Sequence, residues 1–162
     1  MKKIIQIEPW IDELELKELK KVIESTFVTE SSLNNKFEEL TSLYTNSKHA
    51  ITICNGTCAL FCSLKALNIG EGDEVIVPNL TFIATATAVV LTGARVRLVD
   101  VNPTTGCIDP LNLLRAINSK TKAVIPVHLY GISCDMDEII EIAKKKNINV
   151  IEDAAQGVGV KS

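Results

Sequence analysis

From residue 49 onward, short apolar runs alternate with stretches of helical periodicity, and this alternation constrains the fold more than any other feature of the sequence. No two of the predicted strands are joined closely enough to form a hairpin, and crossovers that carry helices connect parallel strands. The sequence therefore predicts an α/β fold, a mainly parallel sheet with helices on both faces. The expected strands are 50–54, 74–77, 96–99, 123–127 and 150–151, and the expected helices are 57–67, 83–91, 110–117 and 136–146.

The first 48 residues carry a different pattern, which predicts a helical arm. Apolar positions spaced as on one helix face occur over residues 11–25, and a second helix is expected over residues 34–45, with Ser31 or Ser32 near its start. Its buried side is expected to carry Phe37, Leu40, Leu43 and Tyr44. The predicted organisation is an arm over residues 1–48, followed by a sheet-containing domain over residues 49–162.

The charge balance argues against a nucleic-acid partner. The chain has 17 Lys and Arg against 20 Asp and Glu, a net charge of −3, and the cations are dispersed. Lys144 to Lys146 form the longest basic run, which is typical of the solvated end of a helix. The N-terminus does not resemble a signal peptide and no stretch approaches the length of a membrane span, so we expect a cytoplasmic protein with no membrane partner.

Five cysteines raise the question of a metal or redox site. Cys54, Cys58 and Cys62 recur every four residues, which would place them on one helix face. No histidine or carboxylate accompanies them to complete a ligand shell. We therefore expect no metal, and these cysteines are interpreted as small buried apolar residues.

Candidate site residues follow the predicted strands, because ligands of such sheets bind outside the carboxyl ends of the strands. Gly56 and Thr57 open a helix directly after a strand, where they could hold a phosphate or simply form a tight turn and cap. Asp153 ends the last strand and could pair with a ligand cation or cap a helix, with Gln156 three residues on. Phe82 could stack on a planar ring or pack in the core.

Several longer runs resemble a known family in both order and spacing. They include Asn55-Gly56-Thr57-Cys58-Ala59-Leu60, Gly70-Glu71-Gly72-Asp73-Glu74-Val75-Ile76-Val77-Pro78, Thr81-Phe82-Ile83-Ala84-Thr85-Ala86, Pro126-Val127-His128-Leu129-Tyr130-Gly131 and Ile151-Glu152-Asp153-Ala154-Ala155-Gln156. Over essentially its whole length, the chain resembles the sugar aminotransferases of the DegT/DnrJ/EryC1/StrS group. The resemblance implies the type I (aspartate aminotransferase) fold and pyridoxal 5'-phosphate (PLP) as cofactor.

The resemblance also implies roles for individual residues. Asp153 would hold the pyridine nitrogen protonated, and Gln156 would hydrogen-bond the 3'-oxygen of the ring. Phe82 would lie against the ring face. The phosphate would be held by Gly56, Thr57 and Cys58, with only the backbone role of Cys58 carried over. No catalytic residue is assigned in this chain, because the resemblance places the family's Schiff-base lysine a few tens of residues beyond the aspartate.

The implied activity is the conversion of a nucleotide-linked keto sugar to an amino sugar, with an amino acid as donor and with the enzyme as a homodimer. On this interpretation residues 49–162 are an incomplete PLP-binding large domain, and the C-terminal half and small domain are absent. The chain alone is then expected to be inactive. Two alternatives remain at this stage: a non-catalytic, truncated remnant of the family, and a generic phosphate-binding α/β module.

Overall fold

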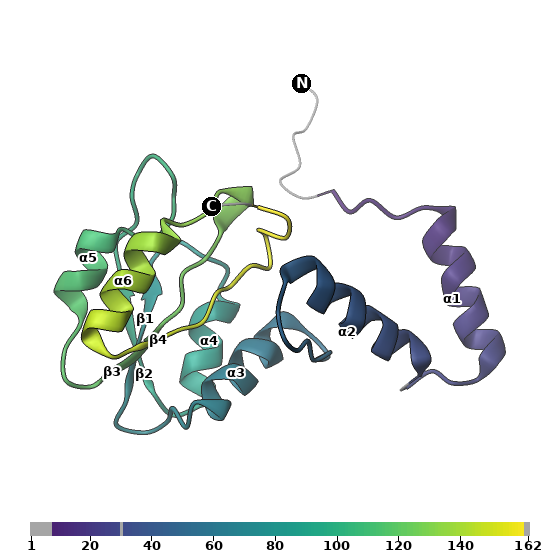
Figure 1. Cartoon of the computed structure of the whole chain (residues 1–162), viewed down its shortest axis with the longest axis horizontal. Coiled ribbons are helices and arrows are strands. Elements are labelled where there is room, and N and C mark those ends of the chain that lie inside the picture. Colours follow the sequence, from purple (N-terminus) through teal and green to yellow (C-terminus); the bar gives the residue numbers. More distant parts are fainter. Residues whose placement is uncertain (1–7, 30, 161–162) are drawn as a thin grey trace. The chain divides into compact units, whose positions relative to one another are not determined.

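A computed structural model describes residues 8–29 and 31–160, which divide at the Thr52–Ile53 boundary into two compact units. The helical unit, up to Thr52, contains α1 (Glu13–Ser25) and α2 (Ser32–Thr45) (Figure 1). Asp12 and Ser31 cap these helices, each through a reciprocal capping box. Both predicted helices therefore form, and Ser31 is the residue that caps the second one.

The apolar side chains of the helical unit are largely exposed. Within the part of the chain that the structure describes, neither α1 nor α2 contains a buried residue. Phe37, Leu40, Leu43 and Tyr44 are 55% to 72% exposed, so the prediction that they lie on a buried side is wrong for this chain. Helical periodicity gathers apolar side chains on one face, but it does not supply a surface that covers them.

The sheet unit, from Ile53 onward, is built on four parallel strands. They are β1 (Glu74–Pro78), β2 (Arg95–Val99), β3 (Thr121–Val124) and β4 (Asn149–Val150), in the order β2-β1-β3-β4. The predicted strand over residues 50–54 does not form, and Ile51 is 79% exposed. An apolar run becomes a strand only where a neighbouring strand accepts its hydrogen bonds, and among the described residues no strand pairs with this segment.

Helices cover both faces of the sheet, as predicted (Figure 1). On one face, α3 (Gly56–Ala66) and α4 (Ala84–Leu91) share a core with Val75, Val77 and Ile125. On the other face, α5 (Pro110–Ala116) and α6 (Met136–Lys146) share a core with Ile76 and Val124. Successive residues of β1 thus enter opposite cores, which is the arrangement of a strand buried on both sides.

The basic run at the end of α6 and the length of the helices were also predicted from the sequence. Lys144 to Lys146 are exposed in the last turn of α6, and Lys145 pairs with Glu141, so the solvated-helix interpretation is confirmed. No helix among the described residues is both long and apolar enough to cross a lipid bilayer.

Candidate functional site

A cavity of about 310 Å³ lies in the sheet unit, where the N-terminus of α3 meets the segments that follow β1, β3 and β4. Five of the six residues predicted for the site line it: Gly56, Thr57, Phe82, Asp153 and Gln156. The other lining residues are Asn55, Leu60, Thr81, Ala84, Val127 and Ala155. Residues as far apart in sequence as Asn55 and Gln156 therefore contribute to one concave surface.

The N-terminus of α3 forms one wall of this cavity. Asn55 is the N-cap, and its side-chain oxygen accepts a hydrogen bond from the Cys58 backbone N–H at 2.9 Å. Cys58 does not line the cavity, so Gly56 and Thr57 present the helix terminus to it. A Cβ built on Gly56 would meet nothing within 4 Å, so glycine leaves space beside the backbone N–H groups. Such a terminus favours an anion.

Backbone pairing beyond the sheet fixes the position of Asp153. The Asp153 N–H donates to the Pro126 carbonyl at 2.9 Å, and the His128 N–H donates to the Asp153 carbonyl at 3.2 Å. Val127 and Asp153 form an isolated parallel bridge. These bonds extend the pairing of β3 with β4 and bring the carboxylate to the carboxyl edge of the sheet.

His128 packs against Gly157 of this segment and does not line the cavity. Its Nδ1 accepts a hydrogen bond from the Cys134 backbone N–H at 3.1 Å, and its Nε2 lies 3.1 Å from Glu152 Oε2. Because a backbone N–H can only donate, the ring proton is on Nε2 and points to Glu152. A Cβ on Gly157 would lie 2.5 Å from the His128 Cβ, so glycine is required for this close packing.

Gln156 and Phe82 present the remaining chemistry. The Gln156 side-chain oxygen accepts from the Tyr130 N–H at 3.1 Å, which leaves the amide hydrogens of Gln156 for a ligand oxygen. Phe82 is 69% exposed, so the alternative that it packs in the core is wrong. Its ring is available as an apolar face beside the cavity.

Three polar residues at or beside the cavity were not predicted as site residues from the sequence. Asn55 precedes a predicted helix and has a residue type typical of N-caps, which is a detectable signal. Thr81 lines the cavity, and Thr85 is fully buried with its hydroxyl 2.8 Å from Asp153 Oδ2. A threonine in an apolar helical segment gives no sequence sign that it contacts a carboxylate 68 residues away.

Cys54, Cys58 and Cys62 are not buried, so the interpretation of them as small buried apolar residues is wrong. Cys54 and Cys62 are exposed and Cys58 is half-buried, whereas Cys107 and Cys134 are the buried pair. A hydrogen bond with Cys54 that favours the protonated thiol raises the pKa of Cys58. Cys58 and Cys62 lie on the face of α3 opposite the buried residues Leu60 and Leu64, and Cys54 precedes the helix.

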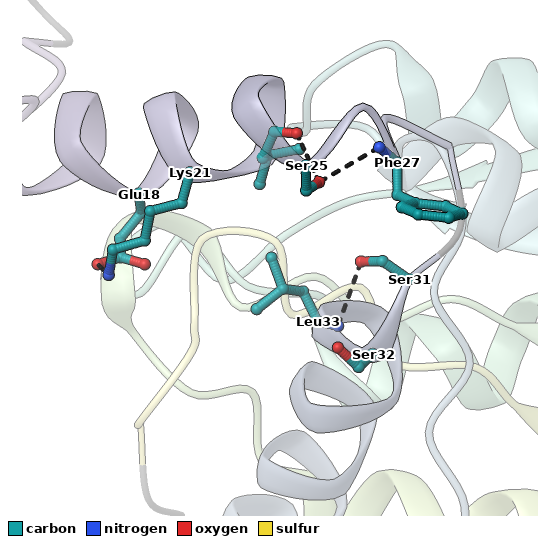
Figure 2. Close-up of a pocket in the computed structure, with 8 residues that line it drawn as sticks. Glu18, Lys21, Ser25, Phe27, Ser31, Ser32 and Leu33 are labelled. Atoms are coloured by element: carbon teal, nitrogen blue, oxygen red, sulfur yellow. Dashed lines mark hydrogen bonds and ion pairs between the residues drawn. The ribbon is translucent and has the colours of Figure 1, made fainter.

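Another cavity, of about 490 Å³, lies within the helical unit (Figure 2). Glu18 and Lys21 on its wall pair with each other at 2.6 Å. Ser25 bonds within its own turn and to the Phe27 N–H, and Ser31 caps α2 (Figure 2). These polar groups are engaged in local contacts, so the cavity of the sheet unit has the better chemistry for a ligand.

The cavity lined by Gly56 and Asp153 joins a helix N-terminus that favours an anion, an exposed aromatic ring and one carboxylate. Among the described residues that line it, Asp153 is the only charged group. This set suits a planar ring that carries an anionic group at one position and a cationic nitrogen at another.

Comparisons with known proteins agree with this chemistry. The model of the DegT/DnrJ/EryC1/StrS aminotransferase family matches residues 9–162. GDP-perosamine synthase of Caulobacter vibrioides is 52% identical over 124 residues, which are 76% of this chain and 33% of that protein.

Two solved structures show the same fold. The aminotransferase from Psychrobacter cryohalolentis is 40% identical with a TM-score of 0.89, over 93% of this chain and 39% of that one. NtdA from Bacillus subtilis, with bound cofactor PMP, is 37% identical with a TM-score of 0.88, over 98% and 39%. The chain therefore spans between a third and two fifths of the length of these relatives.

Proposed function

Because the chain belongs to the DegT/DnrJ/EryC1/StrS aminotransferase family, whose cofactor is PLP, we propose that it forms the cofactor-binding part of a sugar aminotransferase. The proposed reaction converts a nucleotide-linked keto sugar to an amino sugar with an amino acid as donor. The name of the 52% identical relative, a GDP-perosamine synthase, supports a nucleotide-linked substrate. The family assignment also supports the type I PLP fold for the sheet unit.

The residues present fit PLP. The phosphate would lie at the N-terminus of α3, where Gly56 leaves open space and Thr57 adds a hydroxyl. Cys58 takes no direct part in this proposal, because its N–H already donates to Asn55. Phe82 would lie against the ring face, and Gln156 would donate to the 3'-oxygen.

Asp153 has the central electrostatic role in the proposal. When bound, PLP supplies an electron sink for the carbanion that forms during amino transfer. An anion beside the ring nitrogen favours the protonated, cationic ring. Asp153 is the charged side chain of the cavity, and its backbone is fixed by hydrogen bonds to both Pro126 and His128.

The single observation that carries the proposal is the convergence of Gly56, Thr57, Phe82, Asp153 and Gln156 on one cavity. A PLP titration followed by absorbance and fluorescence tests it. We expect Asp153→Asn to weaken binding by about tenfold, a change of about 1.4 kcal/mol, because a neutral amide cannot stabilise a pyridinium.

Asp137→Asn is the matched control, since Asp137 lies in the first turn of α6 and outside this cavity. Equal PLP affinities for wild type and Asp153→Asn would contradict the assigned role. Saturable binding of inorganic phosphate, with no preference for PLP, would instead favour the generic phosphate-binding module.

The source of the reacting lysine decides between an active enzyme and a non-catalytic remnant. No lysine lines the cavity within residues 8–29 and 31–160, and Lys161 lies outside the described residues. Borohydride reduction with PLP, followed by peptide mass spectrometry, detects a lysine that reacts with the cofactor. We expect no such adduct on this chain, and an adduct on one unique lysine would show that the chain supplies it.

A homodimer is part of the same proposal. The exposed apolar side chains of α1 and α2, together with β2 and β4 as the outermost strands of the sheet among the described residues, support self-association. Sedimentation velocity over a range of concentrations measures it. A strictly monomeric chain at all concentrations would contradict association through these surfaces.

A further inference from the structure

Thr85 of α4 is a fully buried polar side chain in direct contact with the candidate site. Its exposed fraction is 0%, and its Oγ1 donates to Asp153 Oδ2 at 2.8 Å. The same hydroxyl oxygen lies 2.9 Å from Thr81 Oγ1 and 3.3 Å from the Phe82 carbonyl. Thr85 therefore stands between the cavity-lining Thr81 and the carboxylate.

The number of available hydrogens determines which group donates in each of these hydrogen bonds. A hydroxyl has one hydrogen, and the carboxylate of Asp153 can only accept. The charge-assisted bond at 2.8 Å takes the Thr85 hydrogen in preference to the longer contact with the Phe82 carbonyl. Thr81 must then donate to Thr85, because the Thr85 hydrogen is already committed. The hydroxyls form a directed chain from Thr81 through Thr85 to Asp153.

The hydrogen bond from Thr85 helps to fix the plane of the Asp153 carboxylate. Thr85 holds Oδ2, and the Ala155 N–H lies 3.3 Å from Oδ1. With donors from two segments, the carboxylate does not rotate freely about its Cβ–Cγ bond. A rigid helix supports the stronger of the two bonds, as pre-organised sites require.

We propose that Thr85, supported by Thr81, is a positioning residue that orients the Asp153 carboxylate toward the pyridine nitrogen of PLP. The inference rests on the proposed function and adds a residue to it. A hydroxyl is needed at position 85, since valine fills the same space but leaves Asp153 Oδ2 without its donor. Serine keeps the hydroxyl and loses only a methyl group.

The test compares two ligands, PLP and deazapyridoxal 5'-phosphate, in which carbon replaces the ring nitrogen. Full-length wild type, Thr85→Val, Thr85→Ser and Thr81→Val are titrated with each ligand, and thermal unfolding is recorded for each variant. The readout is the ratio of the two dissociation constants. A merely structural role would change both affinities together and leave this ratio unchanged.

We expect Thr85→Val to weaken PLP binding about tenfold while its affinity for the deaza analogue stays within about twofold of wild type. Thr85→Ser should retain the wild-type ratio, and Thr81→Val should show a smaller loss than Thr85→Val. An unchanged ratio in Thr85→Val, whether both affinities fall or neither does, would overturn the proposal.

The affinities of the wild-type protein for the two ligands distinguish a failure of the proposed function from a failure of the role of Thr85. If wild type binds PLP and prefers it to the analogue, the Asp153 assignment holds and the variants alone decide the role of Thr85. If wild type binds both ligands equally, or neither, then the proposed function fails and the inference about Thr85 falls with it.

Discussion

The helical unit and the sheet unit are stabilised in different ways. In the helical unit, α1 and α2 each have a full capping box, yet none of their described residues is buried. In the sheet unit, α4 has no side-chain cap at its N-terminus, but Thr85, Ala88 and Val89 are buried against the sheet. Local signals are sufficient to define where a helix begins, whereas a core is needed to hold a site in place.

The largest expected difference between the units is in core truncation. Ile125→Ala removes a fully buried side chain and should lower the free energy of unfolding by about 2–5 kcal/mol. Leu40→Ala, at a position 55% exposed in α2, should change it by less than about 0.5 kcal/mol. Urea denaturation followed by circular dichroism measures both. Equal losses would break the comparison and show that the face of α2 is covered in solution.

A second pair of variants compares two glycines of the sheet unit, Gly157 in close packing and Gly56 beside open space. Gly157→Ala drives a Cβ to 2.5 Å from the His128 Cβ and should cost about 1–3 kcal/mol. Gly56→Ala places a Cβ where nothing lies within 4 Å, and should leave stability within about 1 kcal/mol while weakening PLP binding. Thermal unfolding and PLP titration distinguish the two effects. A stable Gly157→Ala protein would contradict the packing described for this segment.

Titration of a buried thiol should make the sheet unit sensitive to alkaline pH. Burial, together with the neighbouring Cys107 thiol, raises the pKa of Cys134 from 9.0 to about 12. The thiol ionises less readily in the folded chain than in the unfolded one, so its stabilising effect is fully present below pH 9. The effect is lost as the pH rises toward 12.

The measurement is the free energy of unfolding between pH 8 and pH 11 for wild type and Cys134→Ala. We expect a steeper decrease for wild type above pH 9. Cys62→Ala, at an exposed position, should keep the wild-type slope. Parallel profiles for wild type and Cys134→Ala would rule out a contribution from the buried thiol.

The smallest expected effect is in the helical unit. Hydrogen bonds from the Thr52 hydroxyl and the Thr52 backbone N–H lower the pKa of Glu38, an exposed group. Thr52→Val removes the hydroxyl bond and should raise the Glu38 midpoint toward its ordinary value. Carboxyl chemical shifts followed by NMR report the change. An unaltered midpoint would show that this contact does not persist in solution.

Much of the fold could be predicted because its signals are local. Apolar runs located β1 to β4, and the helix expected over residues 110–117 forms as α5. The strand expected over residues 50–54 failed because strand formation depends on a pairing partner, which the run itself does not encode. The burial of the α2 face failed for a similar reason, since periodicity gives a face without giving its partner.

The candidate site was predictable to the extent that its residues follow strands. Phe82 and Asp153 come just after strands that form, and the topology of a parallel sheet brings such positions to one edge. Gly56 was expected to follow a strand that does not form, and it reaches the cavity as the first residue of α3. Thr85 could not be predicted in this way, because its contact with Asp153 depends on how α4 packs on the sheet. Contacts between distant elements become visible only in the folded structure.

The residues proposed to bind the cofactor all lie in the sheet unit. Backbone amide NMR of the full-length chain during a PLP titration tests this most directly. We expect shifts at Gly56, Thr57, Phe82, Asp153 and Gln156, and none in α1 or α2. Shifts confined to the residues around Glu18, Lys21 and Leu33, or no shifts at saturating PLP, would contradict it.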